Sequence, residues 1–392
     1  MTEKLFYEDS HMITFCANVE ACEKVGDYYE VVLDRTAFFP EGGGQSADTG
    51  MLGNIKVLDV QEKGDIIYHV LEGPIAVGKE ICGEIDWPQR FSDMQQHSGE
   101  HIVSGLIHAT YGLNNVGFHM GKDAITMDFD GAITKEQLKQ IEKKANEVVV
   151  QNLDIRVLYP TKEELQNMEY RSKIEIAGQV RVVEIPGYDR CACCAPHVKK
   201  TGEIGIIKLT GMQNYKGGVR VSMLCGFRAL ENYEEKAESV KQVSVLLSAK
   251  EREIAGEVLR IKEELSEKKR EIAVLQRELL TYRVQAIPEG QPLTIVFETG
   301  LEGDSPREYV NLLLEKNIGI AAVFVGNSTD GYRYVIGSRK KDVRLYAKMI
   351  QEKFGGRGGG KAEMVQGTAS GNEEAIREEM QRWAKEMYSS VS

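Results

Sequence analysis

Long apolar runs are absent from this chain of 392 residues. The start, Met1-Thr2-Glu3-Lys4, is not followed by the apolar stretch of a secretory signal. No segment approaches the roughly 20 apolar residues that a membrane-spanning helix needs. We therefore expect a cytoplasmic protein that has no membrane partner.

Regularly spaced cysteines and an excess of positive charge are also absent. Three of the seven cysteines lie within Cys191-Ala192-Cys193-Cys194, and this clustering favours metal binding or catalysis over a disulfide-stapled secreted domain. The net charge of −11 argues against bulk attraction to nucleic acid, although a local basic patch can still bind it. Charge alone therefore does not exclude an RNA partner.

The composition is that of a globular protein, with 42% hydrophobic and 28% charged residues, and the length predicts more than one domain. The periodicity of the apolar residues predicts a multidomain chain of the α+β and α/β classes. In residues 1–90, short β-branched and aromatic segments at 28–33, 55–60 and 66–71 predict a small β-barrel that carries a Gly-Gly-Gly-Gln loop.

Residues 91–228 predict an α+β domain. Pro88 suits the first turn of a helix that runs to about residue 110, and Gly112 suits its end. A second helix over 135–151 is followed by strands at 155–158, 179–185 and 205–209.

Two further regions follow. Residues 229–285 have a four-three apolar spacing, broken only by Lys268, which predicts a helical hairpin or a coiled coil that could pair two copies as a homodimer. The apolar residues of this spacing are Ile254, Val258, Ile261, Leu265, Ile272, Leu275 and Leu279. Residues 286–392 predict an α/β domain, with strands at 293–297 and 321–325 and helices at 308–315 and 343–354.

Two segments almost a hundred residues apart carry candidate metal ligands. His97 and His101 lie four residues apart, so a helix places both imidazoles on one face, and Cys193 and His197 repeat the spacing. Nitrogen and thiolate donors favour Zn²⁺ over Mg²⁺ or Ca²⁺, which prefer oxygen. We predict one Zn²⁺ per chain. Four protein ligands normally close a structural site, so catalysis requires a ligand to yield or the coordination to expand.

Two alternatives to this ligand set stay open. Cys191 or Cys194 could replace Cys193 or lie beside the ion. The run from His97 to His101 also fits the H-x-x-E-H pattern of inverted zinc peptidases, in which Glu100 would be the general base. That assignment leaves the second segment unexplained, and otherwise Glu100 is a solvated helix residue.

The segment Gly42-Gly43-Gly44-Gln45 predicts either a hairpin loop or a ligand cradle. Three consecutive glycines permit positive φ and close approach of the backbone. Their exposed N–H groups could hold a carbonyl oxygen or a terminal ribose.

A basic patch lies near the C-terminus. Between Arg339 and Lys361 the sequence has eight basic residues against two acidic ones, beside a glycine-rich loop. The patch, which includes Lys340, Lys341 and Arg357, suits contact with a phosphate backbone, and a solvated helix face is the alternative.

Several of these motifs together resemble one known family. Segments 36–45, 97–101, 117–121 and 181–197 are similar to the editing domain of alanyl-tRNA synthetases and AlaX proteins, over residues 1 to about 226. Segment 355–367 looks like the glycine-rich signature of the DHH-associated domain that closes those synthetases. Because the chain starts at the barrel, with no room for an aminoacylation module, it resembles the free-standing long form, AlaX-L.

The resemblance implies a trans-editing hydrolase that cleaves the ester of tRNA(Ala) mischarged with serine or glycine and spares Ala-tRNA(Ala). It implies that His97, His101, Cys193 and His197 are the zinc ligands. It also implies a catalytic pocket and a surface that holds the tRNA. The pocket residues are Thr36, whose hydroxyl bonds the seryl side chain, with Gln45, His119, Gly42, Gly43 and Gly44, and the surface residues are Arg339, Lys340, Lys341, Arg357 and Lys361.

One segment departs from the family. The usual Cys-Gly-Gly-Thr-His or Cys-Cys-Gly-Thr-His stands here as Cys193-Cys194-Ala195-Pro196-His197. The ligands remain, but proline stiffens the turn and the threonine hydroxyl is lost. The alternative function is therefore a tRNA-binding protein with a structural zinc site and no turnover.

Overall fold

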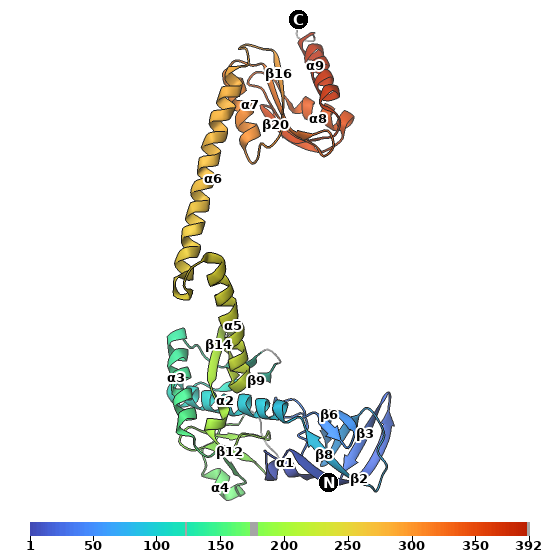
Figure 1. Ribbon diagram of the computed structural model, residues 1–392, viewed down its shortest axis with the longest axis vertical. Coiled ribbons are helices and arrows are strands. Elements are labelled where there is room, and N and C mark those ends of the chain that lie inside the picture. Colours follow the sequence, from blue (N-terminus) through green and yellow to red (C-terminus); the bar gives the residue numbers. More distant parts are fainter. Residues whose placement is uncertain (122–123, 173–178, 390–392) are drawn as a thin grey trace. The chain divides into compact units, whose positions relative to one another are not determined.

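The computed structural model describes residues 1–121, 124–172 and 179–389 (Figure 1). The chain divides into two compact units, Met1–Gln242 and Val243–Ser392, and each contains helices and sheets. The expected multidomain chain of mixed α and β structure is confirmed, whereas the division at residues 90, 228 and 285 stays a prediction. Every helix within the described residues is too short or too polar to cross a membrane.

The first unit begins with a closed β-barrel of strand order β2-β3-β7-β6-β5-β8. Its strands are β2 (Thr14–Val25), β3 (Tyr28–Leu33), β5 (Gly50–Leu52), β6 (Ile55–Lys63), β7 (Ile66–Leu71) and β8 (Glu80–Ile85). In β7 every second residue, Ile67, His69 and Leu71, is buried in the barrel, as the period of a strand requires. A parallel pair, β1 (Glu3–Lys4) and β4 (Arg35–Thr36), and the short helix α1 (Leu5–Glu8) adjoin the barrel strands in sequence.

A disulfide joins two barrel strands. Cys16 on β2 lies opposite Cys82 on β8 in the antiparallel register, and their sulfur atoms are bonded. The sequence did not predict this pair, because the two cysteines are 66 residues apart and only the fold brings them together.

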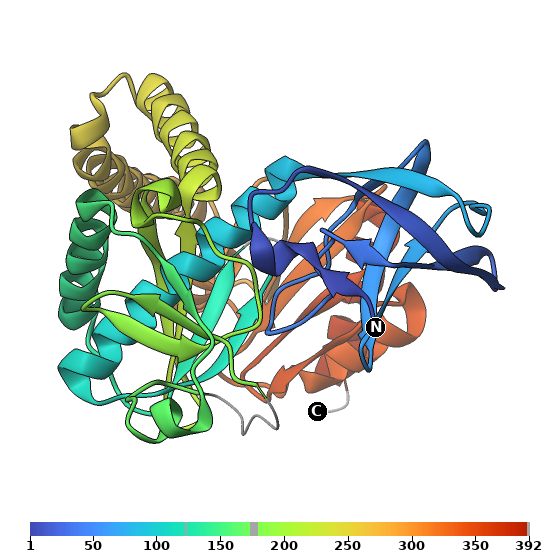
Figure 2. The same ribbon diagram turned by 90° about the horizontal axis from the view of Figure 1, so that it is seen from below.

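Helix α2 (Trp87–Tyr111) runs from the barrel strands, blue in Figure 2, into the green elements of the same unit. The Asp86 side chain accepts the Gln89 N–H, Pro88 lies in the first turn, and the helix ends at Gly112, whose φ is 69°. Every residue from 94 to 107 is buried. A helix buried all round presents its polar side chains to the interior rather than to water.

The remaining elements of the first unit enclose α2. An antiparallel sheet has the order β14-β15-β10-β9, and a smaller one has the order β11-β12-β13. The elements are β9 (Asn115–Met120), β10 (Ile125–Phe129), α3 (Lys135–Gln151), β11 (Arg156–Leu158), α4 (Lys162–Gln166), β12 (Val182–Ile185), β13 (Asp189–Ala192), η1 (Thr201–Ile204), β14 (Ile207–Tyr215) and β15 (Gly218–Cys225).

Helix α5 (Gly226–Leu247) crosses the boundary between the units, and the second unit contains one sheet of order β16-β17-β18-β20-β19. Its elements are η2 (Glu251–Glu253), α6 (Ile254–Gln285), β16 (Leu293–Glu298), α7 (Ser305–Glu315), β17 (Ile320–Asn327), β18 (Gly331–Gly337), α8 (Arg344–Phe354), β19 (Gly358–Lys361), β20 (Met364–Ala369) and α9 (Glu373–Ser389). β16 and β17 are parallel and the other pairs of this sheet are antiparallel, so the sheet is mixed.

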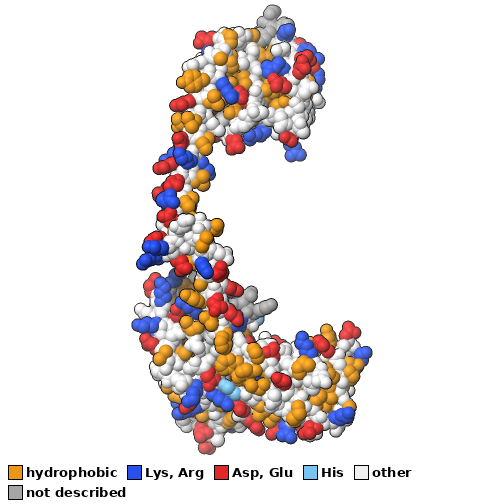
Figure 3. Space-filling view, in the orientation of Figure 1, with side chains coloured by type: hydrophobic (Ala, Val, Ile, Leu, Met, Phe, Trp, Pro, Cys, Tyr) orange, Lys and Arg blue, Asp and Glu red, His pale blue; other side chains and the backbone are white. Residues whose placement is uncertain are grey.

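The apolar stripe of α6 is exposed. Its members Val258, Ile261, Leu265, Ile272, Leu275 and Leu279 are each between 41% and 57% exposed. Figure 3 shows apolar side chains interspersed with charges of both signs along this helix. Exposed apolar residues that recur along one helix are typical of an interaction surface.

Candidate metal centre

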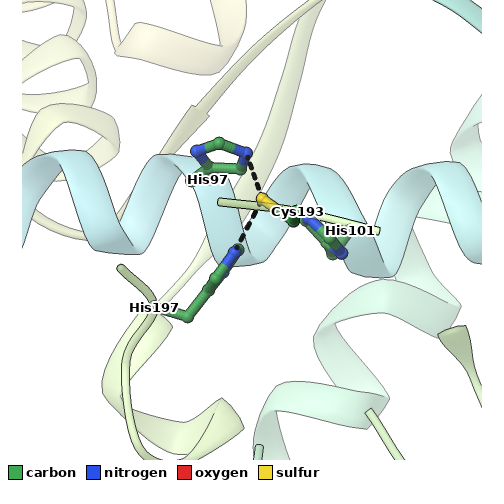
Figure 4. A group of neighbouring side chains, drawn as sticks. All are labelled: His97, His101, Cys193 and His197. Carbon is green, nitrogen blue, oxygen red and sulfur yellow. Dashed lines mark hydrogen bonds between the residues drawn. The ribbon is translucent and has the colours of Figure 1, made fainter. Parts of the chain in front are cut away.

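His97 and His101 lie one turn apart on α2, and Cys193 and His197 come from the segment that follows β13 (Figure 4). One donor atom from each of these four residues lies within 4.8 Å of every other. Cys193 Sγ lies 3.5 Å from His97 Nε2 and 3.4 Å from His197 Nε2. A sulfur and a nitrogen that share one tetrahedral ion at the bond lengths of zinc lie about 3.6 Å apart. The four side chains can therefore hold one metal ion.

Two of these imidazoles are oriented through their other nitrogen. His97 Nδ1 lies 3.0 Å from Gln45 Oε1, and His101 Nδ1 lies 2.9 Å from Asp189 Oδ2. Asp189 also accepts two hydrogen bonds from Arg171, at 2.7 and 2.9 Å. Because amide and carboxylate oxygens only accept, Nδ1 carries the proton in both rings and Nε2 is available to a metal.

The third imidazole, that of His197, is oriented by a serine of α2. Ser98 Oγ lies 3.0 Å from His197 Nδ1 and accepts the Val198 N–H at 3.3 Å. Sequence reasoning missed Ser98 and Asp189 as partners of the ligands. A polar residue beside a ligand and an acidic residue four positions before Cys193 were the available signals.

The neighbouring groups of the cluster shift the pKa values of Cys193 and His101 in opposite directions. Burial raises the pKa of the Cys193 thiol, but the neighbouring His97 and His197 outweigh burial and hold that pKa well below its usual range. Burial lowers the pKa of His101, but its hydrogen bond to Asp189 outweighs burial and raises the pKa. The shift of Cys193 favours the thiolate, the form that binds metals, whereas the shift of His101 favours the imidazolium, which must lose a proton when it binds a metal.

The geometry distinguishes the three clustered cysteines. Cys193 is the one grouped with all three histidines. Cys191 is buried in a second group with His101 and Asp189, both of which already bond each other. Cys194 is exposed. Neither neighbour is needed to complete the four-residue cluster.

Arg181 shapes the turn that carries Cys193. Its Nη1 donates to the carbonyl oxygens of Cys193 and Ala195 at 2.8 and 3.0 Å, and its own carbonyl accepts the Cys193 N–H at 3.1 Å. The guanidinium also lies over the ring of Tyr7, 4.8 Å from its centre. The side chain of Arg181, which is not part of the turn, therefore fixes the backbone of the turn.

The glycine loop packs directly against this cluster. At Gly44, where φ is 83°, a Cβ would lie 2.7 Å from the Phe118 ring. At Gly43, where φ is 60°, a Cβ would lie 3.0 Å from Cys194 Sγ. Both positions need glycine because of the positive φ and the close approach.

Gln45 has a buried donor with no partner. The residue is 1% exposed, and its Oε1 accepts from His97. Its Nε2 is buried and has no hydrogen-bond partner among the residues that the structure describes. Since an unpaired buried donor costs about 1–3 kcal/mol, this atom indicates a ligand that offers an acceptor.

Thr36 and His119 differ in their surroundings. Thr36 is fully buried, and its Oγ1 lies 2.8 Å from His69 Nε2. His119 is exposed on β9, whereas its neighbour Phe118 lies 4.9 Å from the His97 ring. Adjacent residues of a strand point to opposite faces. The structure therefore does not bring His119 to the cluster.

The position of Glu100 contradicts its interpretation as a solvated residue of the helix. It is 1% exposed, so it is not a solvated helix residue. Its Oε1 accepts from Ser104 at 2.7 Å and from Asn115 at 2.5 Å. The all-round burial of α2 is the reason, because every face of the helix in this stretch meets protein.

A buried ion pair that the sequence did not predict joins the barrel to α2. Arg90 and Asp48 are 1% and 3% exposed and bond each other through two nitrogens. Arg90 also donates to the Ala37 carbonyl at 2.7 Å, and Asp48 accepts the Phe39 N–H at 2.5 Å. This network fixes the segment after Thr36 against the helix that carries two candidate ligands.

A cavity of about 300 Å³ in the first unit is lined by residues close in sequence to Gln45 and to His97. Its lining includes Ser46, next to Gln45, and Asp93, one helical turn before His97. Burial raises the pKa of Asp93 to about 6, although Arg228 opposes the shift. The cavity offers hydroxyl, carboxyl and guanidinium groups to a polar ligand.

The predicted basic patch belongs to the second unit. Arg339, Lys340, Arg357 and Lys361 are exposed and Lys341 is half-buried. Other basic residues of this stretch are paired: Arg344 with Asp342, Lys348 with Glu352, and Lys353 with Glu379. Pairing makes the patch less positive than the sequence suggests.

The chain matches three families of domains. Residues 2–89 match the family described as tRNA synthetases class II (A), residues 180–222 match the threonyl and alanyl tRNA synthetase second additional domain, and residues 290–386 match the DHHA1 domain. Two of the three matched families are therefore families of tRNA synthetase domains.

The similar full-length proteins are alanine-tRNA ligases. The chain is 33% identical to the alanine-tRNA ligase of Pyrobaculum calidifontis, over 97% of this chain and 44% of that enzyme. It is 29% identical to that of Ignicoccus hospitalis and 30% identical to that of Pyrococcus abyssi, over 92% and 93% of this chain and 40% and 42% of those enzymes. The chain is thus similar to alanine-tRNA ligases over almost its whole length, which confirms the resemblance drawn from its motifs, and it spans less than half of the length of these relatives.

Proposed function

We propose that this protein is an AlaX-like trans-editing hydrolase of the cytoplasm that deacylates Ser-tRNA(Ala), and also Gly-tRNA(Ala), with one Zn²⁺ per chain. The observation that carries the proposal is the unpaired, buried Nε2 of Gln45 beside the candidate metal ligands. A purely structural metal site has no need of an unused donor aimed beside it. The family of the chain supplies the class of substrate.

The donor set suits zinc. Three imidazole nitrogens and one thiolate match the usual ligands of Zn²⁺, and the distances from Cys193 Sγ fit a shared tetrahedral ion. His97, His101, Cys193 and His197 would hold it. When bound, the ion would supply a Lewis acid for the substrate's α-amine, its carbonyl or a water.

Side chains of the protein itself would orient the substrate ester. The His97 proton fixes the Gln45 amide so that Nε2 faces outward from the ring and can donate to the ester carbonyl oxygen. A water oxygen adds to the carbonyl carbon, the bond from that carbon to the ribose oxygen breaks, and the ribose oxygen takes a proton. The products are the free amino acid and tRNA with its terminal hydroxyl restored.

Other parts of the chain would hold the tRNA. The cavity at Ser46 and Asp93 offers acceptors and donors for the terminal ribose. The exposed residues Arg339, Lys340, Arg357 and Lys361, with Lys341, would contact phosphates. Two copies would pair through the apolar stripe of α6, which sedimentation of the intact chain can test.

The direct test measures hydrolysis of Ser-tRNA(Ala), Gly-tRNA(Ala) and Ala-tRNA(Ala) by the wild type and Cys193→Ala. We expect hydrolysis of the two mischarged species alone, and a Cys193→Ala protein that is folded but has lost zinc and at least ~100-fold of its activity. Cys22→Ala is the matched control, because Cys22 is an unpaired cysteine of the barrel outside the cluster.

The same experiment separates the alternative function. A tRNA-binding protein with a structural zinc site would bind tRNA(Ala) without hydrolysing any of the three species. Its fold, rather than a reaction, would fail on chelation of the metal. The closed set of four protein ligands is the observation that favours this alternative.

A further inference from the structure

The face of α2 that carries the two candidate ligands continues toward the start of the helix. Gln89, Asp93, His97 and His101 stand four residues apart and therefore lie along one ridge of the helix. Gln89 and Asp93 line the cavity of about 300 Å³, whereas His97 and His101 belong to the candidate metal cluster. Because four helical residues rise about 6 Å, the cavity begins one turn away from His97.

Two other walls of the cavity also come from segments that reach the cluster. Ser46 follows Gln45, whose Oε1 lies 3.0 Å from His97 Nδ1. Met120 stands two residues after Phe118 on β9, so both side chains lie on the same face of that strand. The Phe118 ring lies 4.9 Å from the His97 ring. Three separate segments that meet at His97 therefore meet again at the cavity, which adjoins the candidate site.

The carboxylate of Asp93 is an unused acceptor in this cavity. The residue is half-buried, and its side chain makes no hydrogen bond or ion pair with the part of the chain that the structure describes. Burial raises the pKa of Asp93 to about 6, although the charge of Arg228 opposes the shift. The carboxyl group is thus mostly ionised at pH 7, and in this form it only accepts hydrogen bonds. A ligand of the cavity should consequently offer a donor.

The size and the position of the cavity fit the alcohol part of an ester. Its volume of about 300 Å³ lies at the lower end of the range of small-molecule pockets, about 300–1,000 Å³, and suits one nucleoside. An ester held at Gln45 would extend its alcohol part into the adjoining space. In an aminoacylated RNA this part is the terminal ribose, and its hydroxyl beside the ester is free to donate.

We propose that the cavity holds the terminal ribose of the substrate and that Asp93 accepts a hydrogen bond from the free hydroxyl beside the ester. The inference rests on the proposed function and deepens it, because it names the residue that recognises the end of the nucleic acid as RNA. A terminal deoxyribose lacks this donor and leaves the carboxylate without a partner.

The test combines a change in the substrate with a change in the side chain. Ser-tRNA(Ala) that is acylated on its 3′-hydroxyl is compared, by kcat/KM on the intact chain, with the same RNA ending in 2′-deoxyadenosine. Asp93→Ala removes the acceptor and Asp93→Asn keeps a neutral one. Asp27→Ala, at an exposed carboxylate of the barrel, is the matched control. The intrinsic effect of the hydroxyl on ester reactivity is the same for every variant and cancels.

The two substrates should respond differently to the loss of Asp93. We expect Asp93→Ala to lower kcat/KM about 10–100-fold for the ribose substrate, as one hydrogen bond to a charged group allows, and less than about threefold for the deoxyribose substrate. Asp93→Asn should lie between the wild type and Asp93→Ala on the ribose substrate, and Asp27→Ala should match the wild type on both. Loss of folded or metal-loaded protein lowers both substrates alike, so a merely structural role does not produce this difference.

The outcomes are distinguishable. Equal losses on the two substrates in Asp93→Ala, or no loss on either, overturn the role of Asp93 but leave the proposed function standing. A wild type that does not hydrolyse the ribose substrate overturns both.

Discussion

The candidate metal centre consists of buried, hydrogen-bonded side chains, whereas the basic surface of the second unit consists of exposed ones. At the centre each imidazole is buried and bonded at its second nitrogen, to Gln45, Asp189 or Ser98. At the surface the exposed Arg357 and Lys361 extend into solvent. Chemistry on one ester needs fixed atoms, whereas contact with a phosphate backbone tolerates mobile charges because it carries no sequence information. The two regions should therefore respond differently to substitution.

The largest expected effect lies in the buried region, at the ion pair between the barrel and α2. Arg90→Met leaves Asp48 buried without its cation and should lower the free energy of unfolding by about 3–5 kcal/mol. Urea denaturation measures this change. Arg35→Met, at an exposed arginine of β4, is the control. A loss under about 1 kcal/mol would show that water or a rearranged neighbour replaces the guanidinium.

The next effect concerns pH and His69. Burial lowers its folded pKa from 6.5 to about 4, so between these values the unfolded chain binds a proton that the folded chain does not. Stability should be fully present above pH about 6.5 and should fall by up to about 3 kcal/mol as pH drops to about 4. The difference between the wild type and His69→Gln, measured by denaturation across this window, isolates the contribution. Parallel curves for the two proteins would contradict it.

A smaller effect is expected at Asp189, which bonds the candidate ligand His101. Asp189→Asn removes the charge that orients His101 and should weaken metal affinity by about 10–100-fold. Competition with a chelator of known affinity measures this. Asp154→Asn, at an exposed carboxylate of the same unit, should leave affinity unchanged. Equal affinity in the two variants would mean that the ring is positioned by packing alone.

The smallest effect lies at the exposed surface. Arg357→Glu and Lys361→Glu should each weaken tRNA binding by about tenfold or less and reduce the salt dependence of binding by about one counterion. The metal content should stay the same. Lys269→Glu, on exposed α6, is the control. A change in the ratio of Ser-tRNA(Ala) to Gly-tRNA(Ala) hydrolysis in these variants would break the separation between the two regions.

The sequence predicted most elements and the four residues that the structure groups as candidate ligands, because these depend on local patterns. The helix at 135–151 and the strands at 28–33 and 66–71 have the predicted bounds. His97 and His101 were recognisable because a helix repeats every 3.6 residues. The same pattern paired Cys193 with His197, which the structure groups with them.

The remaining features depend on tertiary contacts that no local pattern carries. Arg90 and Asp48 are 42 residues apart and appear in sequence as ordinary surface charges. His69 occupies an inward position of a strand, where an apolar residue was the default expectation. Glu100 was assigned to water because the period of a helix does not reveal that every face is covered. His119 was proposed for the pocket, although the pleat turns Phe118 to the cluster instead.

The hydrogen bonds from Arg181 to the carbonyl oxygens of Cys193 and Ala195 determine which substitutions this segment can tolerate. The shape of the turn is held by the side chain of Arg181, which precedes β12, and so the turn does not require glycine within residues 193 to 197. Substitutions at the exposed Cys194 should therefore leave the turn in place, whereas Ala195 and Pro196 are buried and limited by packing.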